Sequence, residues 1–446
     1  MSLGCDKVIK LNDSFNSKKL IKFTLPTILM TIFTSIYGIV DGLFVSNIIN
    51  SNAFASINLI MPFTMILGAV GLMFGTGGGA LVSKTLGEKE ELKANRYFSM
   101  VIRIAIFVGI VLAIIGFILM KPISMFLGAK NQLIDMCVTY GRILMISLPF
   151  LILQNCFQSF MIVEEKPKLG LTFSIIAGVS NMVLDFFMIF VFKLGIAGAA
   201  VATMLSQTLG GFIPLFYFKT KSKKLKLINS KAEYKPIIKS CTNGISEMIS
   251  NMSYSIVNVV FNLQIIKYIG LNGVVSYGII NYVSFLFISI YLGFSTGSIP
   301  IIAYHYGAGN KEEIRKILKL STKMLFICSI IVTLVSEIFS KTFVSFFVSN
   351  NQELLEISIL AFRLFSVSYL VDWFNIYSSS FFTALNDGKT SGIISFFRAF
   401  AGQMIMILLL PIIFGTNGLW LAATFGELIT ICISIYYYRK NKSRYC

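Results

Sequence analysis

The sequence is poor in charged residues, and acidic residues are the scarcest of them. Among 446 residues, 13% are Asp, Glu, Lys or Arg and 56% are apolar. Soluble globular domains carry about 25% charged residues, so the composition excludes an ordinary water-soluble fold. Only 20 Asp and Glu face 38 Lys and Arg. Each acid within an apolar stretch therefore requires an explanation.

Paired cysteines and a removable leader are also lacking. The seven cysteines are scattered without a CxxC spacing, and most fall in apolar stretches. This pattern favours packing residues over disulfides or metal ligands. The first 22 residues are polar and contain no small-residue cleavage site ahead of a short apolar core. We therefore expect the first apolar stretch to be retained as a helix.

Long apolar stretches make up most of the chain. A helix crosses about 30 Å of hydrocarbon with about 20 residues. Twelve stretches reach this length: residues 23–46, 55–82, 97–120, 136–161, 169–192, 196–218, 240–265, 273–302, 320–342, 355–383, 391–414 and 416–438. The sequence predicts an all-α integral membrane protein with twelve transmembrane helices.

The basic residues gather in alternate loops. With the N-terminus placed in the cytosol, 29 of the 38 Lys and Arg lie in cytosolic segments and five lie in outer loops. The positive-inside rule then places both termini in the cytosol of a multi-pass cell-membrane protein. The net charge of +18 is explained by anionic lipid headgroups rather than by nucleic acid.

A basic segment divides the predicted helices into two sets of six. Residues 72–93 resemble residues 292–315, and residues 195–203 resemble residues 415–423. Two parallel six-helix repeats favour a central cavity between lobes that can rock. The predicted parts are a cytosolic segment at 1–22, a first lobe at 23–218, a linker with eight Lys at 219–239, a second lobe at 240–438 and a cytosolic tail at 439–446.

Four acidic residues stand out among those inside predicted helices. Asp41 and Asp185 fall in the outer halves of helices 1 and 5, whereas Glu247 and Asp372 fall in helices 7 and 10. Burial of a charge in a bilayer costs at least about 3 kcal/mol, so each acid needs a partner or a task. The first two lie at similar depths and can face one another. Without a basic residue at that depth, they would hold a proton or bind a metal cation.

A neutral side chain accompanies one of these acids. The segment NMVLD places Asn181 one helical turn before Asp185. Both side chains therefore lie on one helix face and can hold one ligand together.

These features resemble the multidrug and toxic compound extrusion (MATE) transporters over nearly the whole chain. The resemblance rests on two six-helix halves, on Pro26 followed by Asp41, on NMVLD at 181–185 and on GIAGAAVAT at 195–203. It implies an antiporter, not an enzyme, that exports cationic amphipathic compounds by alternating access. A Na⁺ or H⁺ gradient would drive it. The 41 Phe and 19 Met suit loosely specified hydrophobic cations.

The resemblance also implies roles for particular residues. The residues at the positions of the family's first-lobe cation site, with Na⁺ as the candidate metal, are Asp41, Asn181, Asp185 and Thr203. Glu247 and Asp372 are similar to a second-lobe acidic pair found in one branch of the family.

Three further residues are candidates for the cavity wall and the hinge. Gln207 and Glu427 match across the repeat and are candidates for lining the cavity. Pro26 is the candidate hinge, because bending of helix 1 would move Asp41.

Two other functions fit parts of the sequence. A lipid-linked oligosaccharide flippase of the same superfamily would need basic residues facing the cavity, for which the candidates are Arg103, Arg142, Arg363 and Arg398. An intramembrane aspartyl protease would use two aspartates, but neither GxGD nor HExxH occurs. We expect a monomer that contacts lipids and binds small organic cations.

Overall fold

The computed structural model describes residues 9–48, 51–229, 233–348 and 351–445, except for the side chains of 38–48, 51–52, 54 and 444. Within these ranges the chain forms helices and turns and no strand. The all-α prediction is confirmed.

The first half forms six long helical segments. They are α1 (Ser17–Ile48), α2 (Ser51–Gly87), α3 (Glu91–Phe126), α4 (Gln132–Val163), α5 (Pro167–Asp185) with the π-helix η1 (Phe186–Val191), and α6 (Gly195–Thr220).

The second half is more broken. It contains α7 (Tyr234–Tyr268), α8 (Leu271–Gly307), α9 (Lys311–Ile338), α10 (Ser340–Ser345), α11 (Gln352–Ser366), α12 (Tyr369–Ala384), α13 (Gly388–Phe396), the π-helix η2 (Phe397–Ala401), α14 (Gly402–Lys440) and the short 3₁₀-helix η3 (Lys442–Arg444). Because α7 begins at Tyr234, it includes the last six residues of the expected linker.

The helices account for the twelve expected spans. By length and apolar composition, nine helices of the described chain can cross a membrane, or ten if α11 and α12, bent by 44°, form one span. The helical stretch 388–440 breaks at Gly415, where φ is 60°, and so provides two spans. The remaining span is α7. It has 35 residues, which is long enough to cross a membrane, but it is more polar than the other spans counted here. A polar helix of this kind needs other helices around it.

Four tight turns show that the repeat extends to the backbone. Each turn contains one residue with positive φ: Lys89 (63°) and Glu165 (64°) in the first half, Gly309 (69°) and Asn386 (57°) in the second. These residues occupy corresponding turns in the two halves, after α2, α4, α8 and α12. The duplication seen in the sequence therefore reproduces the chain reversals as well.

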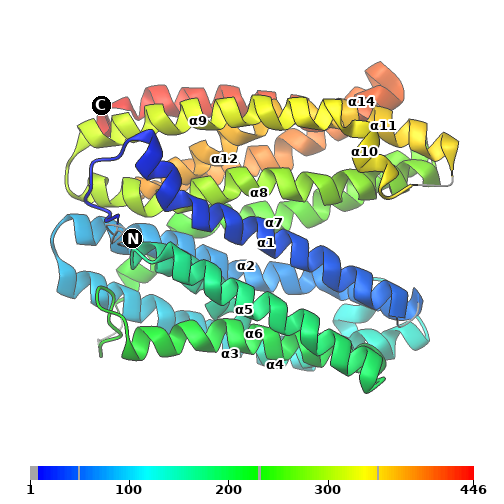
Figure 1. Cartoon of the computed structure of the whole chain (residues 1–446), viewed down its shortest axis with the longest axis horizontal. Coiled ribbons are helices and arrows are strands. Elements are labelled where there is room, and N and C mark those ends of the chain that lie inside the picture. Colours follow the sequence, from blue (N-terminus) through cyan, green and yellow to red (C-terminus); the bar gives the residue numbers. More distant parts are fainter. Residues whose placement is uncertain (1–8, 49–50, 230–232, 349–350, 446) are drawn as a thin grey trace, which may run out of the picture.

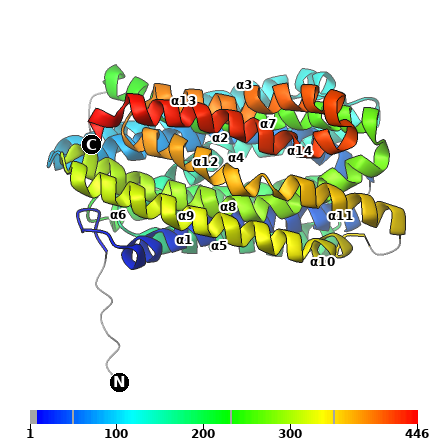
Figure 2. The ribbon, with the colours of Figure 1, turned by 90° about the horizontal axis from the view of Figure 1, so that it is seen from above.

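The two halves form two lobes that lie side by side. Figure 1 shows α2 to α6 on one side of the bundle and α8, α9, α12 and α14 on the other, with α1 running between them. Figure 2, turned by 90°, shows most helices aligned with the long axis. Helix α1 begins and α14 ends at the same end of the bundle, which we call the terminal end (Figure 1). The opposite end is the distal end.

Glycines allow the lobes to touch backbone to backbone near the terminal end. A Cβ on Gly87 of α2 would lie 2.0 Å from a carbonyl oxygen of α8, and one on Gly307 of α8 would lie 1.9 Å from a carbonyl oxygen of α2. Gly77 of α2 and Gly244 of α7 make the same reciprocal approach, at 2.0 and 1.9 Å. Only a residue without a Cβ fits at such distances.

Side chains reinforce this closure. Thr31 Oγ1 of α1 donates to the Ser289 carbonyl in the middle of α8, at 2.8 Å. Asn386 donates to the Ala80 carbonyl of α2 at 3.4 Å. The glycine contacts and the Asn386 contact lie in the half of the bundle nearer the terminal end, where the lobes are packed closed, and the Thr31 contact lies near its middle.

Candidate functional site in the two lobes

The first-lobe acid lies where α5 changes its winding. Asp185 is the last α-helical residue and is 0% exposed, and the π-helix η1 follows at once. A π-turn of this kind, at which the amide of Phe192 donates to the carbonyl of Phe187, often marks a functional site in a helix. Asp185 lies in the distal half of its span.

Asn181 lies one turn away and has an unused polar atom. It is 2% exposed, and its amide nitrogen has no hydrogen-bond partner among the described residues. An unsatisfied buried polar group costs about 1–3 kcal/mol. The two ends of an Asn amide are distinguished only through their partners, so the group can present either its donor or its oxygen to a ligand. This side chain fits a polar ligand or a small cation beside Asp185.

The other expected members of this site are placed less closely. Asp41 belongs to α1, but its side chain lies outside the described residues. Thr203 is half-buried on α6, the neighbour of α5. Gln207, one turn further, is held by a different contact, since its Oε1 accepts a hydrogen bond from Ser147 Oγ of α4 at 2.7 Å.

The second lobe contains a hydrogen-bonded acidic cluster. Asp372 of α12 is 6% exposed and accepts from Ser368 Oγ at 3.1 Å. Glu427 of α14 is 4% exposed and accepts from Asn375 Nδ2 at 2.7 Å. Asn375 in turn accepts from Ser434 Oγ at 2.8 Å. The charge of Asp372 acts unfavourably on the Glu427 carboxylate.

A cation within the second lobe offsets this charge. Arg398, in the π-helix η2, donates from Nη2 to Ser250 Oγ at 3.1 Å. Its charge attracts Glu247, which is half-buried on α7, as well as Asp372 and Glu427. The expected pair of Glu247 and Asp372 is therefore part of a larger group with three acids and one base.

The sequence reasoning missed the roles of Asn375 and Ser434. Asn375 follows Asp372 by three positions and so shares its helix face, a signal that was available in DWFN. No sequence pattern marks the approach of Ser434, because that contact depends on how α14 packs against α12.

The other deep arginines lie at the periphery. Arg103 donates to the carbonyl of Ile228 in the linker. Arg142 lies over the Phe117 ring, 5.2 Å from its centroid. Arg363 is 53% exposed and lies 3.8 Å from Glu337. These three already have local partners away from the lobe centres.

The expected hinge, Pro26, is buried inside α1, and the helix continues through it from Ser17 to Ile48. It lies in the terminal half of α1, and residues on both sides of it, Thr24 and Thr27, approach Gly297 of α8.

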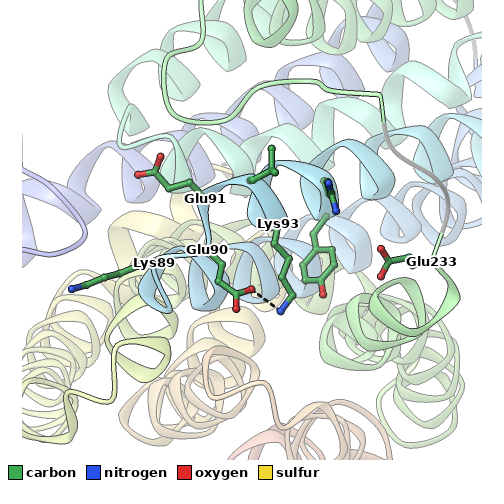
Figure 3. A pocket seen from close by; sticks show the side chains of 8 residues that line it. Lys89, Glu90, Glu91, Lys93 and Glu233 are labelled. Atoms are coloured by element: carbon green, nitrogen blue, oxygen red, sulfur yellow. Dashed lines mark ion pairs between the residues drawn. The ribbon is translucent and has the colours of Figure 1, made fainter.

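A hollow on the surface is separate from these groups. Figure 3 shows its lining at the turn between α2 and α3, where Lys93 points to Glu90 while Lys89 and Glu91 point away. Its volume is about 620 Å³, and the Lys93–Glu90 ion pair spans 2.6 Å. Three acids and three bases line it (Glu90, Glu91, Glu233, Lys89, Lys93 and Arg96). This balanced surface gives no preference for a charged ligand.

Twelve spans in two matching lobes, with acids buried in each, define a duplicated multi-pass membrane protein. The sequence matches the MatE family profile over residues 26–187 and again over residues 247–409. The chain therefore belongs to the MatE family and is a transporter rather than an enzyme. The resemblance inferred from the sequence motifs is confirmed.

Named relatives cover nearly the full length. The chain is 26% identical over 427 residues to multidrug export protein MepA of Staphylococcus haemolyticus (strain JCSC1435), covering 93% of this chain and 90% of that protein. It is 24% identical over 412 residues to multidrug export protein MepA of Staphylococcus aureus (strain MRSA252), covering 90% and 88%.

Solved structures share the fold. A MATE transporter in complex with MaL6 superposes with a TM-score of 0.93 at 20% identity, with 98% of each chain covered. An outward-facing multidrug resistance MATE family transporter of the MOP superfamily gives a TM-score of 0.91 at 20% identity, again with 98% of each chain covered. The two-lobe architecture is thus common to all three.

Proposed function

We propose that this protein is a cation-coupled multidrug efflux antiporter that exports organic cations by alternating access. The observation that carries the proposal is the buried Asn181 and Asp185 face, which combines a carboxylate with an amide nitrogen that no described residue satisfies. The named relatives support the substrate class, since both are multidrug export proteins. The coupling ion is Na⁺, H⁺ or both in competition.

The proposed topology places the terminal end in the cytosol. It rests on the concentration of basic residues in the terminal segments and the loops at that end. Because the lobes are closed in the terminal half, the structure then corresponds to a state that is shut towards the cytosol. A cation arriving from outside would bind the first-lobe site, which lies in the distal half.

The chemistry of the site allows both coupling ions. Na⁺ is a hard cation that prefers several oxygen ligands, which Asp41, Asn181, Asp185 and Thr203 would supply with a backbone carbonyl or water. A proton needs one carboxylate only. Na⁺ binding and protonation of an aspartate therefore exclude each other, and lower pH should displace Na⁺.

A flippase is less well supported. Its diphosphate substrate would need cations at the lobe centres, whereas Arg398 is the one candidate among the four that faces the internal acids. We further propose that the protein works as a monomer in the cell membrane, contacts lipid and binds no nucleic acid.

The test is efflux of a fluorescent organic cation from proteoliposomes that contain the purified protein. A Na⁺ gradient alone is compared with a proton gradient alone, and the Na⁺ gradient is repeated at about pH 7.5 and about pH 5.5. We expect Na⁺-driven efflux at the higher pH and its loss at the lower one. Equal efflux with and without Na⁺ at both values would leave a proton antiporter, and no efflux under any gradient would refute the function.

A further inference from the structure

A short segment ahead of α1 lies against both lobes. Residues 9–16, which we call the N-terminal strap, are non-helical. Leu11 and Phe15 are both 0% exposed and belong to a core cluster built mainly from α8, α9 and α12 of the second lobe. The Phe15 ring meets the His305 ring of α8 edge-on, with 6.5 Å between centroids. The strap is therefore packed into the protein and not draped over its surface.

The second lobe holds the strap through one buried carboxylate. Glu313 of α9 is 7% exposed. Its Oε1 accepts the Phe15 backbone amide at 2.6 Å, and its Oε2 accepts Ser14 Oγ at 3.1 Å. Lys316 adds a donor to Ser14 Oγ at 2.7 Å. Both carboxylate oxygens thus point at the strap.

The first lobe holds the same strap through a second carboxylate. Glu165, in the turn between α4 and α5, accepts the Leu11 backbone amide at 2.7 Å. Glu165 is also 2.7 Å from Lys224 of the linker, and the Lys224 ammonium lies 6.0 Å from the centre of the Tyr304 ring in the second lobe. An acid from each lobe therefore binds this one short segment, and the two backbone amides that they accept, those of Leu11 and Phe15, are four residues apart.

We propose that the N-terminal strap is a latch that keeps the two lobes together at the terminal end and must release one lobe before the cytosolic side can open. Amides that donate to carboxylates form the stronger class of hydrogen bond. Separation of the lobes would break the bond at Glu165 or the bonds at Glu313, and would pull Leu11 or Phe15 from the core. The inference rests on the proposed function for its biological meaning, but the latch itself is a structural claim.

The test measures the distance between the lobes directly. Spin labels are placed at Leu92→Cys on α3 and Lys319→Cys on α9, both exposed near the terminal end, in a protein from which the seven native cysteines have been removed. Double electron–electron resonance on the full chain in nanodiscs then reports closed and separated lobes. Glu313→Ala should raise the ratio of separated to closed lobes roughly tenfold, the effect expected when charge-assisted hydrogen bonds are lost. The matched control is Glu312→Ala, which removes an exposed acid one position earlier.

A second variant removes the bond between the strap and the first lobe. Glu165→Ala should shift the same distance distribution in the same direction, with Glu91→Ala as the exposed first-lobe control. Distances unchanged by both Glu313→Ala and Glu165→Ala, in protein that elutes as the parent does, would overturn the proposal. A distance shift in protein that transports no organic cation would uphold the latch and reject the function. Normal efflux of the organic cation without a distance shift would uphold the function and reject the latch.

Discussion

The two lobes share one frame but differ in how they hold their acids. In the first lobe, Asp185 lies in the distal half of its span, at an α-to-π junction beside an amide nitrogen that has no hydrogen-bond partner among the described residues. In the second lobe, Asp372 and Glu427 are also buried, and each accepts a hydrogen bond from a neighbouring side chain. The Asn181 amide nitrogen is thus available to a ligand, whereas the acids of the second lobe are already held by neighbouring side chains, which pre-organises them for a fixed role.

The sixth helix of each lobe makes the same difference visible at one position. Gln207 and Glu427 match across the repeat, and each is hydrogen-bonded by the fourth span of its own lobe, through Ser147 and Asn375 respectively. The same pair of spans makes the contact in both lobes, but the donors stand at positions that do not match across the repeat, and the acceptor is neutral in the first lobe and acidic in the second. Arg398 accompanies the charged version. We infer that ion coupling belongs mainly to the first lobe and that the second lobe adjusts it.

The largest effect is predicted for substitutions of the first-lobe acids. Asp185→Asn keeps the shape of the side chain and removes its charge, so coupled efflux should fall roughly 100-fold, as expected for an interaction of about 3 kcal/mol. Asp41→Asn should act in the same way. Efflux of a cationic dye from proteoliposomes measures the loss.

The comparison with the second lobe makes this test specific. Asp372→Asn and Glu247→Gln should each lower efflux much less. Asp135→Asn, which alters an exposed acid in the first turn of α4, should leave efflux unchanged. Normal transport by both first-lobe variants would show that the site has been placed in the wrong lobe.

The second prediction concerns the symmetric glycines that let the lobes touch. Gly87→Ala and Gly307→Ala each drive a methyl group into a facing carbonyl, at 2.0 and 1.9 Å. Each should destabilise the closed protein by about 1–3 kcal/mol, and by similar amounts, because the contacts are reciprocal. The measurement is the thermal unfolding midpoint in detergent. Gly278→Ala of α8, where a Cβ meets nothing within 4 Å, is the control and should be neutral or slightly stabilising.

The third prediction tests the adjusting role of the second lobe. Glu427→Gln preserves the acceptor for Asn375 but removes the negative charge that faces Arg398 and Asp372. Efflux should fall only several-fold, because the first-lobe site remains intact. The pH at which the remaining efflux is half-maximal should stay close to that of the parent protein. A complete loss on Glu427→Gln would reverse the ranking of the two lobes.

Much of the fold followed from the sequence because it depends on composition. Apolar length determined the spans, and the repeat was visible in the match of Gly87 with Gly307, where the structure finds the reciprocal lobe contact. The buried acids could be predicted because a charged residue in an apolar helix is costly and therefore indicates a function. Helix α7 was predicted as the apolar stretch 240–265, although it is not among the helices that are apolar enough by composition to count as a membrane span.

The remaining features depend on packing between distant segments. The π-turn after Asp185 and the one containing Arg398 leave no residue pattern that distinguishes them from ordinary helix. The bond from Asn375 to Glu427 joins residues 52 positions apart. The strap is held by Glu165 and Glu313, which look like ordinary surface acids in short loops and helix starts.

The smallest predicted effect isolates the neutral contact of the first lobe. Ser147→Ala removes the donor to Gln207 Oε1 and leaves a half-buried amide, so the protein should lose about 1 kcal/mol of stability. Transport should stay within about twofold, since no charge is moved and Asn181 and Asp185 are untouched. Asn375→Ala is the counterpart in the second lobe and should cost more, because it leaves the Glu427 carboxylate without its side-chain donor. Thermal unfolding midpoints and dye efflux are measured on both variants together. If Ser147→Ala lowers efflux as strongly as Asn375→Ala, then Gln207 and Glu427 have the same role in transport. The proposed division between the lobes would then be wrong.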